Sequence, residues 1–283
     1  MEKEKVFKII KISIITILVI ALIILYARFI GTSGLIVKEY PLKTSYLPSS
    51  YDGFKIVHFS DLHYGSTVSL KEIKKLVSKI NEQNPDLVIF TGDLIDQDYT
   101  LSEKERDKLI KELSNIDANI ETLTVIGNHD YKNDDFNIIT EALEWHFLDN
   151  TYEYVFNKSE IPIVFVGLDD LMLGSPDYNN AFSYLNEIDG NYYTIVLGHE
   201  PDQIDEISNY DFNLFLSGHS HLGQVRVPLI GAVYTPYGSK KYYDEHYKVK
   251  NSELYISNGI GTSILKLRLF NRPSINLYRF YTN

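Results

Sequence analysis

The chain has 283 residues, no cysteine and a formal net charge of −11. The lack of cysteine excludes disulfides and thiolate-bound metal. The acidic balance argues against a nucleic-acid partner, which needs Lys and Arg gathered on one face. The length suits an N-terminal anchor followed by one domain of about 230 residues.

The N-terminal segment is strongly apolar. Between residues 12 and 26 the only polar side chains are Ser13 and Thr16. We therefore predict that residues 1–30 form a transmembrane anchor, a length that can cross a bilayer. The lysines on its N-terminal side place the N-terminus in the cytoplasm and the domain on the extracytoplasmic side of the cell membrane: Lys3, Lys5, Lys8 and Lys11. The alternative is a cleaved signal peptide, but residues 26–28 (Tyr-Ala-Arg) make a poor cleavage site.

Residues 31–51 read as a linker that Pro41 and Pro48 stiffen, with room for an edge strand at 35–40. The main domain is expected to span residues 52–283. Capping-box patterns at Ser69 and Ser102 each predict the start of a helix, and residues 136–145 a third. From residue 154 onward strands predominate, at 154–156, 163–167, 193–197, 212–216, 254–256 and 275–280. Strands and helices alternate in the first half of this domain, and strands predominate in the second half. This order predicts an α/β fold of two packed sheets flanked by helices.

Five polar motifs each follow an apolar, strand-like run. They are Asp61-Leu62-His63, Gly92-Asp93, Gly127-Asn128-His129-Asp130, Gly198-His199-Glu200 and Gly218-His219-Ser220-His221. Ligand sites in α/β sheets lie at the carboxyl ends of strands. Asp61 and His63 alternate, so in an extended segment they project to the same side. Asp93 has two oxygens and can bridge two ions. Mixed nitrogen and oxygen donors favour Mn, Fe, Zn or Co.

This ordered set of motifs resembles the calcineurin-like metallophosphoesterases, from about residue 54 to the C-terminus. The segments 223–228 and 268–273 are similar to those of a membrane-anchored bacterial branch of that family. The resemblance implies a four-layer α/β/β/α sandwich with two metal sites. Their expected ligands are Asp61, His63, Asp93 and His221 for the first, and Asp93, Asn128, His199 and His219 for the second. It also implies that His129 is a general acid and that Asp130 orients it.

The resemblance further implies a two-metal phosphohydrolase that attacks phosphorus with a metal-generated hydroxide. We expect a phosphodiesterase acting on phosphodiester or pyrophosphate bonds of lipid or cell-envelope substrates. One alternative is a pyrophosphatase acting on a nucleotide-linked diacylated sugar. A second is a metal-binding scaffold without activity, which the complete ligand set disfavours.

Four other residues are not expected to bind metal or substrate. His58, His146 and His246 match no motif, and Arg226 is more simply a partner in a salt bridge than a contact to a substrate phosphate. Leu222 departs from the family pattern, because many relatives have glycine after the last histidine of this motif.

Overall fold

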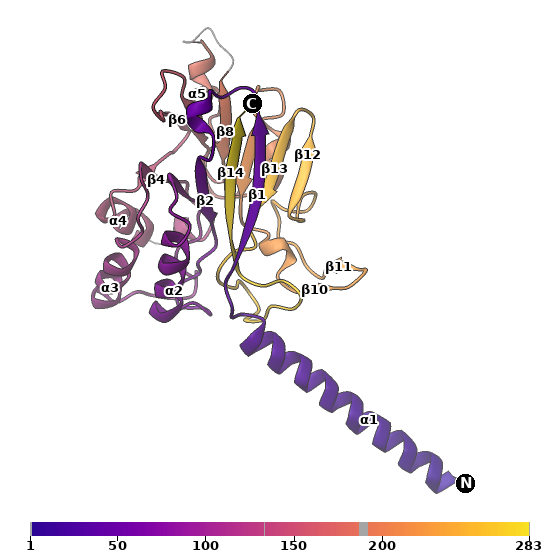
Figure 1. Ribbon diagram of the computed structural model, residues 1–283. Helices are drawn as coiled ribbons and strands as arrows, with labels where there is room; N and C mark the ends of the chain where they lie inside the picture. Colours follow the sequence, from indigo (N-terminus) through magenta and orange to yellow (C-terminus); the bar gives the residue numbers. More distant parts are fainter. Residues whose placement is uncertain (1, 133, 187–191, 283) are drawn as a thin grey trace.

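The computed structural model describes residues 2–132, 134–186 and 192–282. Two six-stranded sheets pack against each other, and one long helix leaves the domain at one end (Figure 1). The predicted sandwich is therefore present, with the apolar N-terminal helix attached to it.

The first sheet has the strand order β1-β14-β2-β3-β4-β5. Its strands are β1 (Ile36–Thr44), β14 (Ser274–Thr282), β2 (Lys55–Phe59), β3 (Leu87–Phe90), β4 (Glu121–Thr124) and β5 (His146–Phe147). Strands β2 to β5 are mutually parallel, so their carboxyl ends meet at one edge. β14 runs antiparallel to β2 and parallel to β1.

The second sheet has the order β12-β13-β9-β8-β7-β6. Its strands are β12 (His246–Val249), β13 (Ser252–Ile256), β9 (Leu214–Ser217), β8 (Tyr193–Leu197), β7 (Ile163–Gly167) and β6 (Thr151–Val155). The four central strands are parallel, and β6 and β12 are antiparallel edges. The sequence did not predict β12, because its four residues, His-Tyr-Lys-Val, do not form an apolar run.

Three helices cover the outer face of the first sheet. They are α2 (Leu70–Asn81), α3 (Glu103–Leu113) and α4 (Asp135–Ala142). Both predicted capping boxes form at the starts of α2 and α3. The apolar stripe of α2 is buried on the sheet, as its helical spacing predicts.

Among the described residues, short helices and loops cover the outer face of the second sheet. The helices are α5 (Tyr178–Ala181) and the 3₁₀ helices η4 (Ser183–Asn186) and η5 (Pro201–Asp205). Pro176 and Pro201 interrupt the segments that form this layer. The fourth layer of the sandwich is therefore thinner than the first.

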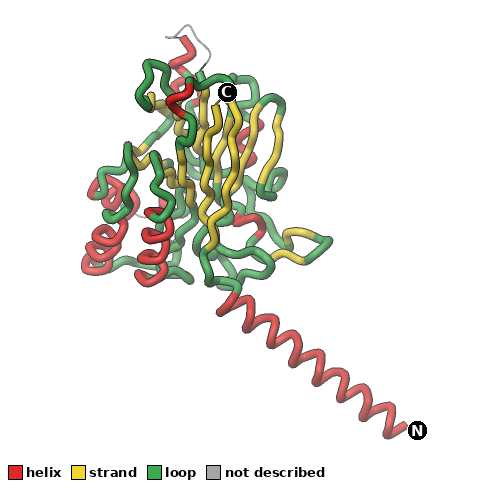
Figure 2. Tube along the Cα trace, in the orientation of Figure 1, coloured by secondary structure: helices red, strands yellow, loops and turns green. Residues whose placement is uncertain are grey.

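The N-terminal helix α1 (Glu2–Leu25) continues as a π-helical turn, η1 (Tyr26–Ile30). Residues Lys3–Ile30 are long and apolar enough to be a candidate membrane span. The expected edge strand is present as β1, which is longer than predicted and belongs to the first sheet. Helix α1 leaves from the end of the sheets where β2 and β9 terminate, and long loops gather at the same end (Figure 2).

Candidate metal centre

The loops after β2, β3, β4, β8 and β9 meet at that end of the sheets and bring the predicted ligands together. Three overlapping buried clusters result, each with donor atoms within 4.8 Å of one another. They are Asp61–His63–His221, His63–Asp93–His129 and Asp93–His199–His219. Asn128 and His129 line the same cleft. The metal-ligand prediction therefore corresponds to a real spatial cluster.

The first cluster has the spacing of ligands around a shared ion. The Nε2 atoms of His63 and His221 are 3.1 Å apart, and His221 Nε2 lies 3.3 Å from Asp61 Oδ1. Donor atoms about 2.1 Å from one ion are roughly 3.0–3.4 Å apart along a coordination edge. Two imidazole nitrogens and a carboxylate oxygen directed at a common point fit a divalent cation.

Asp93 lies between the clusters. Its Oδ1 accepts the backbone N–H of His129 at 2.9 Å, which fixes the carboxylate plane. Its Oδ2 lies 3.5 Å from His63 Nε2 and 3.3 Å from His199 Nε2. One oxygen therefore faces donor atoms of both clusters.

The other two histidines are oriented by backbone carbonyls. His199 Nδ1 donates to Thr91 O at 2.6 Å, and His219 Nε2 donates to Tyr237 O at 2.7 Å. Each ring thus directs its second nitrogen at the cluster, an arrangement typical of metal-bound histidines. The buried atoms His199 Nε2 and Asn128 Oδ1 have no hydrogen-bond partner among the described residues. These orphaned acceptors fit a bound cation.

The backbone of the ligands is left-handed at five positions. Positive φ angles occur at Asp61 (52°), His63 (42°), Asp93 (63°), His219 (64°) and His221 (47°). Such conformations cost of order 1–3 kcal/mol each in non-glycine residues and concentrate at functional sites. The expectation that Asp61 and His63 share one side of an extended segment is wrong, because β2 ends at Phe59. Tight turns bring them together instead.

Two glycines allow the β3 and β4 loops to touch. A Cβ on Gly92 would meet the backbone N of Gly127 at 2.5 Å, and Gly92 has a φ of +88°. A Cβ on Gly127 would meet Asp93 Oδ1 at 2.5 Å. Any side chain at either position would therefore push Asp93 away from the cluster.

His129 carries its proton on the side of the cluster. Its Nδ1 accepts the backbone N–H of Gln97 at 3.3 Å, so the neutral ring is protonated at Nε2, which lies 3.9 Å from Asp93 Oδ2. Burial lowers the pKa of His129, although Asp93 opposes this effect. His129 is thus a neutral hydrogen-bond donor that faces the cleft.

The structure contradicts the expected role of Asp130 as the group that orients His129. Asp130 Oδ1 accepts the N–H of Leu94 at 2.8 Å, and Oδ2 accepts those of Asp93 at 2.7 Å and Gly127 at 3.0 Å. Burial and the nearby Asp93 raise the pKa of Asp130 to about 7, against the effect of these three donors. Asp130 therefore joins the β3 and β4 loops, and the Gln97 backbone takes the place beside His129.

We expect Asp130→Ala to lower the free energy of unfolding by at least about 3 kcal/mol. Three buried N–H groups would lose their acceptor, and each costs about 1–3 kcal/mol. Asp130→Asn keeps one acceptor oxygen and should lose less. Urea unfolding of the two variants against the parent chain measures the difference. Equal stability of Asp130→Ala and the parent would contradict this role.

The Asp93 carboxylate is held ionised by its neighbours. Burial alone would raise its pKa, but the neighbouring imidazoles, His199 first, outweigh burial and lower the pKa well below the usual value. Burial would also raise the pKa of Asp61, but its histidine neighbours, chiefly His221, lower it below the usual value. Two ionised carboxylates among imidazoles give the cluster the charge that a divalent cation requires.

Sequence reasoning missed two residues behind His221. Arg268 is fully buried, and its guanidinium donates to the carbonyls of Asn258, Gly259 and Gly261 and lies 3.1 Å from His221 Nδ1. Burial lowers the pKa of Arg268 to about 9. Asn271 donates to the carbonyl of His221. The only sequence signal for either was the 268–273 segment, which was interpreted as a mark of the family.

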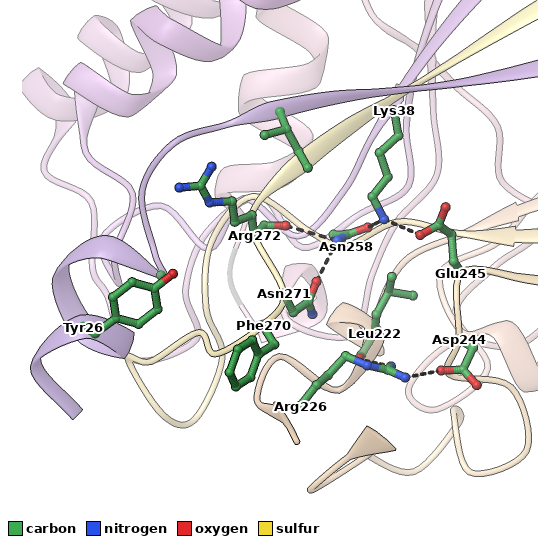
Figure 3. Close-up of a pocket in the computed structure, with 12 residues that line it drawn as sticks. Tyr26, Lys38, Leu222, Arg226, Asp244, Glu245, Asn258, Phe270, Asn271 and Arg272 are labelled. Atoms are coloured by element: carbon green, nitrogen blue, oxygen red, sulfur yellow. Dashed lines mark hydrogen bonds and ion pairs between the residues drawn. The ribbon is translucent and has the colours of Figure 1, made fainter. Parts of the chain in front are cut away.

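Leu222 and Arg226 line a second cavity, of about 560 Å³, beside the base of α1 (Figure 3). Leu222 has a left-handed backbone (φ 48°, ψ 33°), as a glycine would, and its side chain is buried. Arg226 pairs with Asp244 at 2.6 Å and donates to the carbonyl of Leu222. Arg226 is therefore in a salt bridge, as expected, and holds the chain after His221.

The three histidines outside the motifs lie outside the cluster. His58 is buried in β2, bonds Thr91 Oγ1 and has its pKa lowered to about 3 by burial. His146 and His246 pair with Glu121 and Glu253. Their separation from the cluster agrees with the sequence analysis.

The cluster forms the floor of a cleft of about 540 Å³. His63, Asp93, Asn128 and His129 line it at the polar end. Val225, Val233, Ile264, Leu265 and Leu267 are among the residues of its walls. The cleft therefore combines a cation-binding floor with apolar sides.

Comparisons with known proteins agree with this centre. The family model "Calcineurin-like phosphoesterase" matches residues 54–223, which include every predicted ligand. The chain is 34% identical over 256 residues to the metallophosphoesterase YkuE of Bacillus subtilis, covering 89% of this chain and 88% of YkuE. It is 28% identical over 235 residues to the phosphodiesterase YaeI of Escherichia coli, and this match covers 79% of this chain and 81% of YaeI.

A transmembrane protein with a metallophosphoesterase domain from Danio rerio is 29% identical over 242 residues. That match covers 81% of this chain, but the chain spans only about half (53%) of the relative. The crystal structure of TT1561 from Thermus thermophilus aligns with a TM-score of 0.51 at 13% identity, covering 74% of this chain and 90% of TT1561, and supports the fold. From the family model and YkuE, the chain belongs to the calcineurin-like phosphoesterase family, whose members are metal-dependent phosphoester hydrolases.

Proposed function

We propose that the chain is a two-metal phosphodiesterase. The observation that carries this proposal is the position of Asp93 Oδ2, within 3.5 Å of imidazole nitrogens on both sides. A carboxylate oxygen so placed can touch two ions, the arrangement that two-metal hydrolysis requires. The relative YaeI is called a phosphodiesterase, which favours a diester over a monoester.

The proposed ligands divide between two sites that share Asp93. Asp61, His63 and His221 complete one site, and Asn128, His199 and His219 complete the other. Mn, Fe, Zn or Co suits this donor set. Two such ions, when bound, supply Lewis acidity that activates water and offsets charge on the phosphoryl oxygens.

His129 is proposed as the general acid. Its Nε2–H faces the cluster because Nδ1 is occupied by the Gln97 N–H. This donor can bind a phosphoryl oxygen. To act as the general acid the ring must also be protonated at Nδ1, and the imidazolium then passes its Nε2 proton to the leaving oxygen as the P–O bond breaks. Asp93, which holds the His129 backbone, positions the ring against the cluster.

The first experiment compares bis-p-nitrophenyl phosphate with p-nitrophenyl phosphate. Full-length chain loaded with Mn²⁺ should release p-nitrophenol from the diester at a higher kcat/KM than from the monoester. Chelation should stop both reactions, and Mn²⁺ should restore them. A preference for the monoester would defeat the diesterase assignment, and activity that survives chelation would defeat the metal mechanism.

We further propose that the substrate carries its phosphodiester or pyrophosphate on a lipid or another cell-envelope component. Helix α1 would span the cell membrane, with the N-terminus in the cytoplasm because of its flanking lysines. A domain tethered in this way stays beside the membrane at its catalytic end.

Protease added to intact spheroplasts should therefore remove the domain and leave α1 behind. An immunoblot against an N-terminal tag measures the remaining fragment, and a cytoplasmic protein serves as the control. Full protection of the domain would reverse the proposed orientation. A soluble chain that begins after residue 27 would show cleavage instead of anchoring.

A further inference from the structure

Large apolar side chains stand exposed on two segments that also contribute residues to the walls of the cleft. The turn between β10 (Arg226–Val227) and β11 (Gly231–Ala232) presents Leu229 and Ile230, which are 108% and 77% exposed. The loop before β14 presents Ile264 and Phe270, 72% and 68% exposed. Together with Val233 and Leu265 they form what we call the apolar rim. Large exposed apolar side chains in such number favour an interaction site over a face kept in water.

The apolar rim lies next to the base of α1. Arg268, in the loop that carries the rim, donates its backbone N–H to Ala27 O at 2.9 Å. The β10–β11 hairpin is tied to the same loop by the bond from Arg226 N to Leu269 O, also 2.9 Å. Figure 1 shows the hairpin near the C-terminal end of α1, where the helix joins the domain. The helix that is proposed to span the membrane thus ends beside the rim.

The charge of the two rim segments is opposite to that of the whole chain. No Asp or Glu occurs in residues 212–243 or 254–283, although the chain holds 38 acidic residues. The exposed Lys266 and Arg272 flank the rim residues, and Lys240 packs over Tyr234. Basic residues that border an apolar face are the pattern of a surface that rests on anionic lipid.

The apolar rim continues into the cleft. Val233, Ile264 and Leu265 line the cleft as well as its mouth. An apolar path therefore runs from the proposed membrane surface to the floor formed by His63 and Asp93.

We infer that the apolar rim rests on the bilayer and that the substrate is a membrane lipid with its acyl chain in this cleft. The inference deepens the proposed function and depends on it. The phosphodiester lies over the metal-ligand cluster, and the acyl chain of the lipid lies between Val233 and Leu265. Water adds to phosphorus and one P–O ester bond breaks. The leaving oxygen takes a proton from the protonated His129, and the proton released by the water restores it.

The contact with the bilayer can be measured on the full chain. Because the protein has no cysteine, Ile230→Cys and Ile264→Cys each give a single site for an environment-sensitive dye. In nanodiscs of phosphatidylglycerol and phosphatidylcholine, nitroxide-labelled lipid should quench both dyes. Glu160→Cys, in the β6–β7 turn at the opposite end of the sheet, is the control and should not be quenched. Absence of quenching at both rim positions would overturn the membrane contact.

The acyl-chain site is tested with two esters that share a leaving group, methyl and decyl p-nitrophenyl phosphate. Each methylene that becomes buried contributes about fourfold. Four buried methylenes would therefore raise kcat/KM for the decyl ester by more than about 100-fold. Ile264→Ser should lower the decyl-to-methyl ratio by about tenfold. Ile161→Ser, which alters an exposed isoleucine far from the cleft, should leave the ratio unchanged.

The two proposals fail in different ways. Equal kcat/KM for the two esters would overturn the lipid-substrate inference and leave the phosphodiesterase intact. If the metal-loaded chain hydrolysed neither ester, the proposed function would fail, and the lipid-substrate inference would fail with it.

Discussion

Asp93→Ala is expected to lower kcat/KM for bis-p-nitrophenyl phosphate by about 10³-fold or more. Asp93 Oδ2 faces the imidazoles of both clusters, so its loss removes a ligand from each proposed site. Metal-ion catalysis is worth several kcal/mol, and each 1.36 kcal/mol corresponds to a factor of ten. Rates measured over a range of Mn²⁺ concentrations should not recover at saturation.

Two control variants separate this effect from a general disturbance. Asp93→Asn keeps an acceptor for the His129 N–H but lowers the charge, so it should lose activity while the backbone stays in place. Asp96→Ala removes a nearby carboxylate that accepts the Asp98 N–H and is in neither proposed ligand set, so it should keep most of the activity. Near-normal activity in Asp93→Ala would mean that this carboxylate does not hold the ions.

His129→Gln should separate acid catalysis from metal binding. General acids contribute about 10²–10⁴-fold, and the contribution grows as the leaving group becomes more basic. The variant should therefore lose much more rate on an alkyl phosphodiester than on a p-nitrophenyl one. Both bound ions should remain, because His129 is not in either proposed ligand set.

Matched kcat/KM values on the two esters, together with metal analysis, measure this difference. Equal losses on both would assign His129 to binding the phosphate rather than to proton transfer. Loss of an ion would place it among the ligands, as its position in the His63–Asp93–His129 cluster allows.

The sequence predicted the strands and helices that carry strong local signals. The buried run Ile163–Gly167 and the capping box at Ser69 appear where the pattern placed them. Strand β12 did not, because it is an edge strand with an alternating polar surface. Pairing with β13 stabilises it, and pairing is not a local property.

The sequence predicted which residues meet at the site, but it did not predict which groups each of them contacts there. Motif spacing identified the residues that meet at the cluster, because each motif ends a parallel strand. It could not show that Asp130 bonds the N–H groups of Asp93, Leu94 and Gly127 rather than serving His129. Such bonds depend on how two loops approach, and only the three-dimensional arrangement fixes that.

Arg268 was missed for a related reason. A lone arginine late in the chain usually lies on the surface, and nothing in its neighbours signals burial. Its guanidinium is buried because the carbonyls of Asn258, Gly259 and Gly261 converge on it behind His221. The sequence did not predict the apolar rim, because its residues lie in two separate segments. Neither segment has a pattern that shows it lies beside α1 in the folded protein.

The most direct test of the two-metal account is the number of ions that the active chain needs. Chelated, full-length protein would be titrated with Mn²⁺ while bound metal and bis-p-nitrophenyl phosphate hydrolysis are measured on the same samples. The account predicts no hydrolysis without metal and full activity only when two ions are bound per chain. Full activity with one ion bound per chain, or with none, would contradict it.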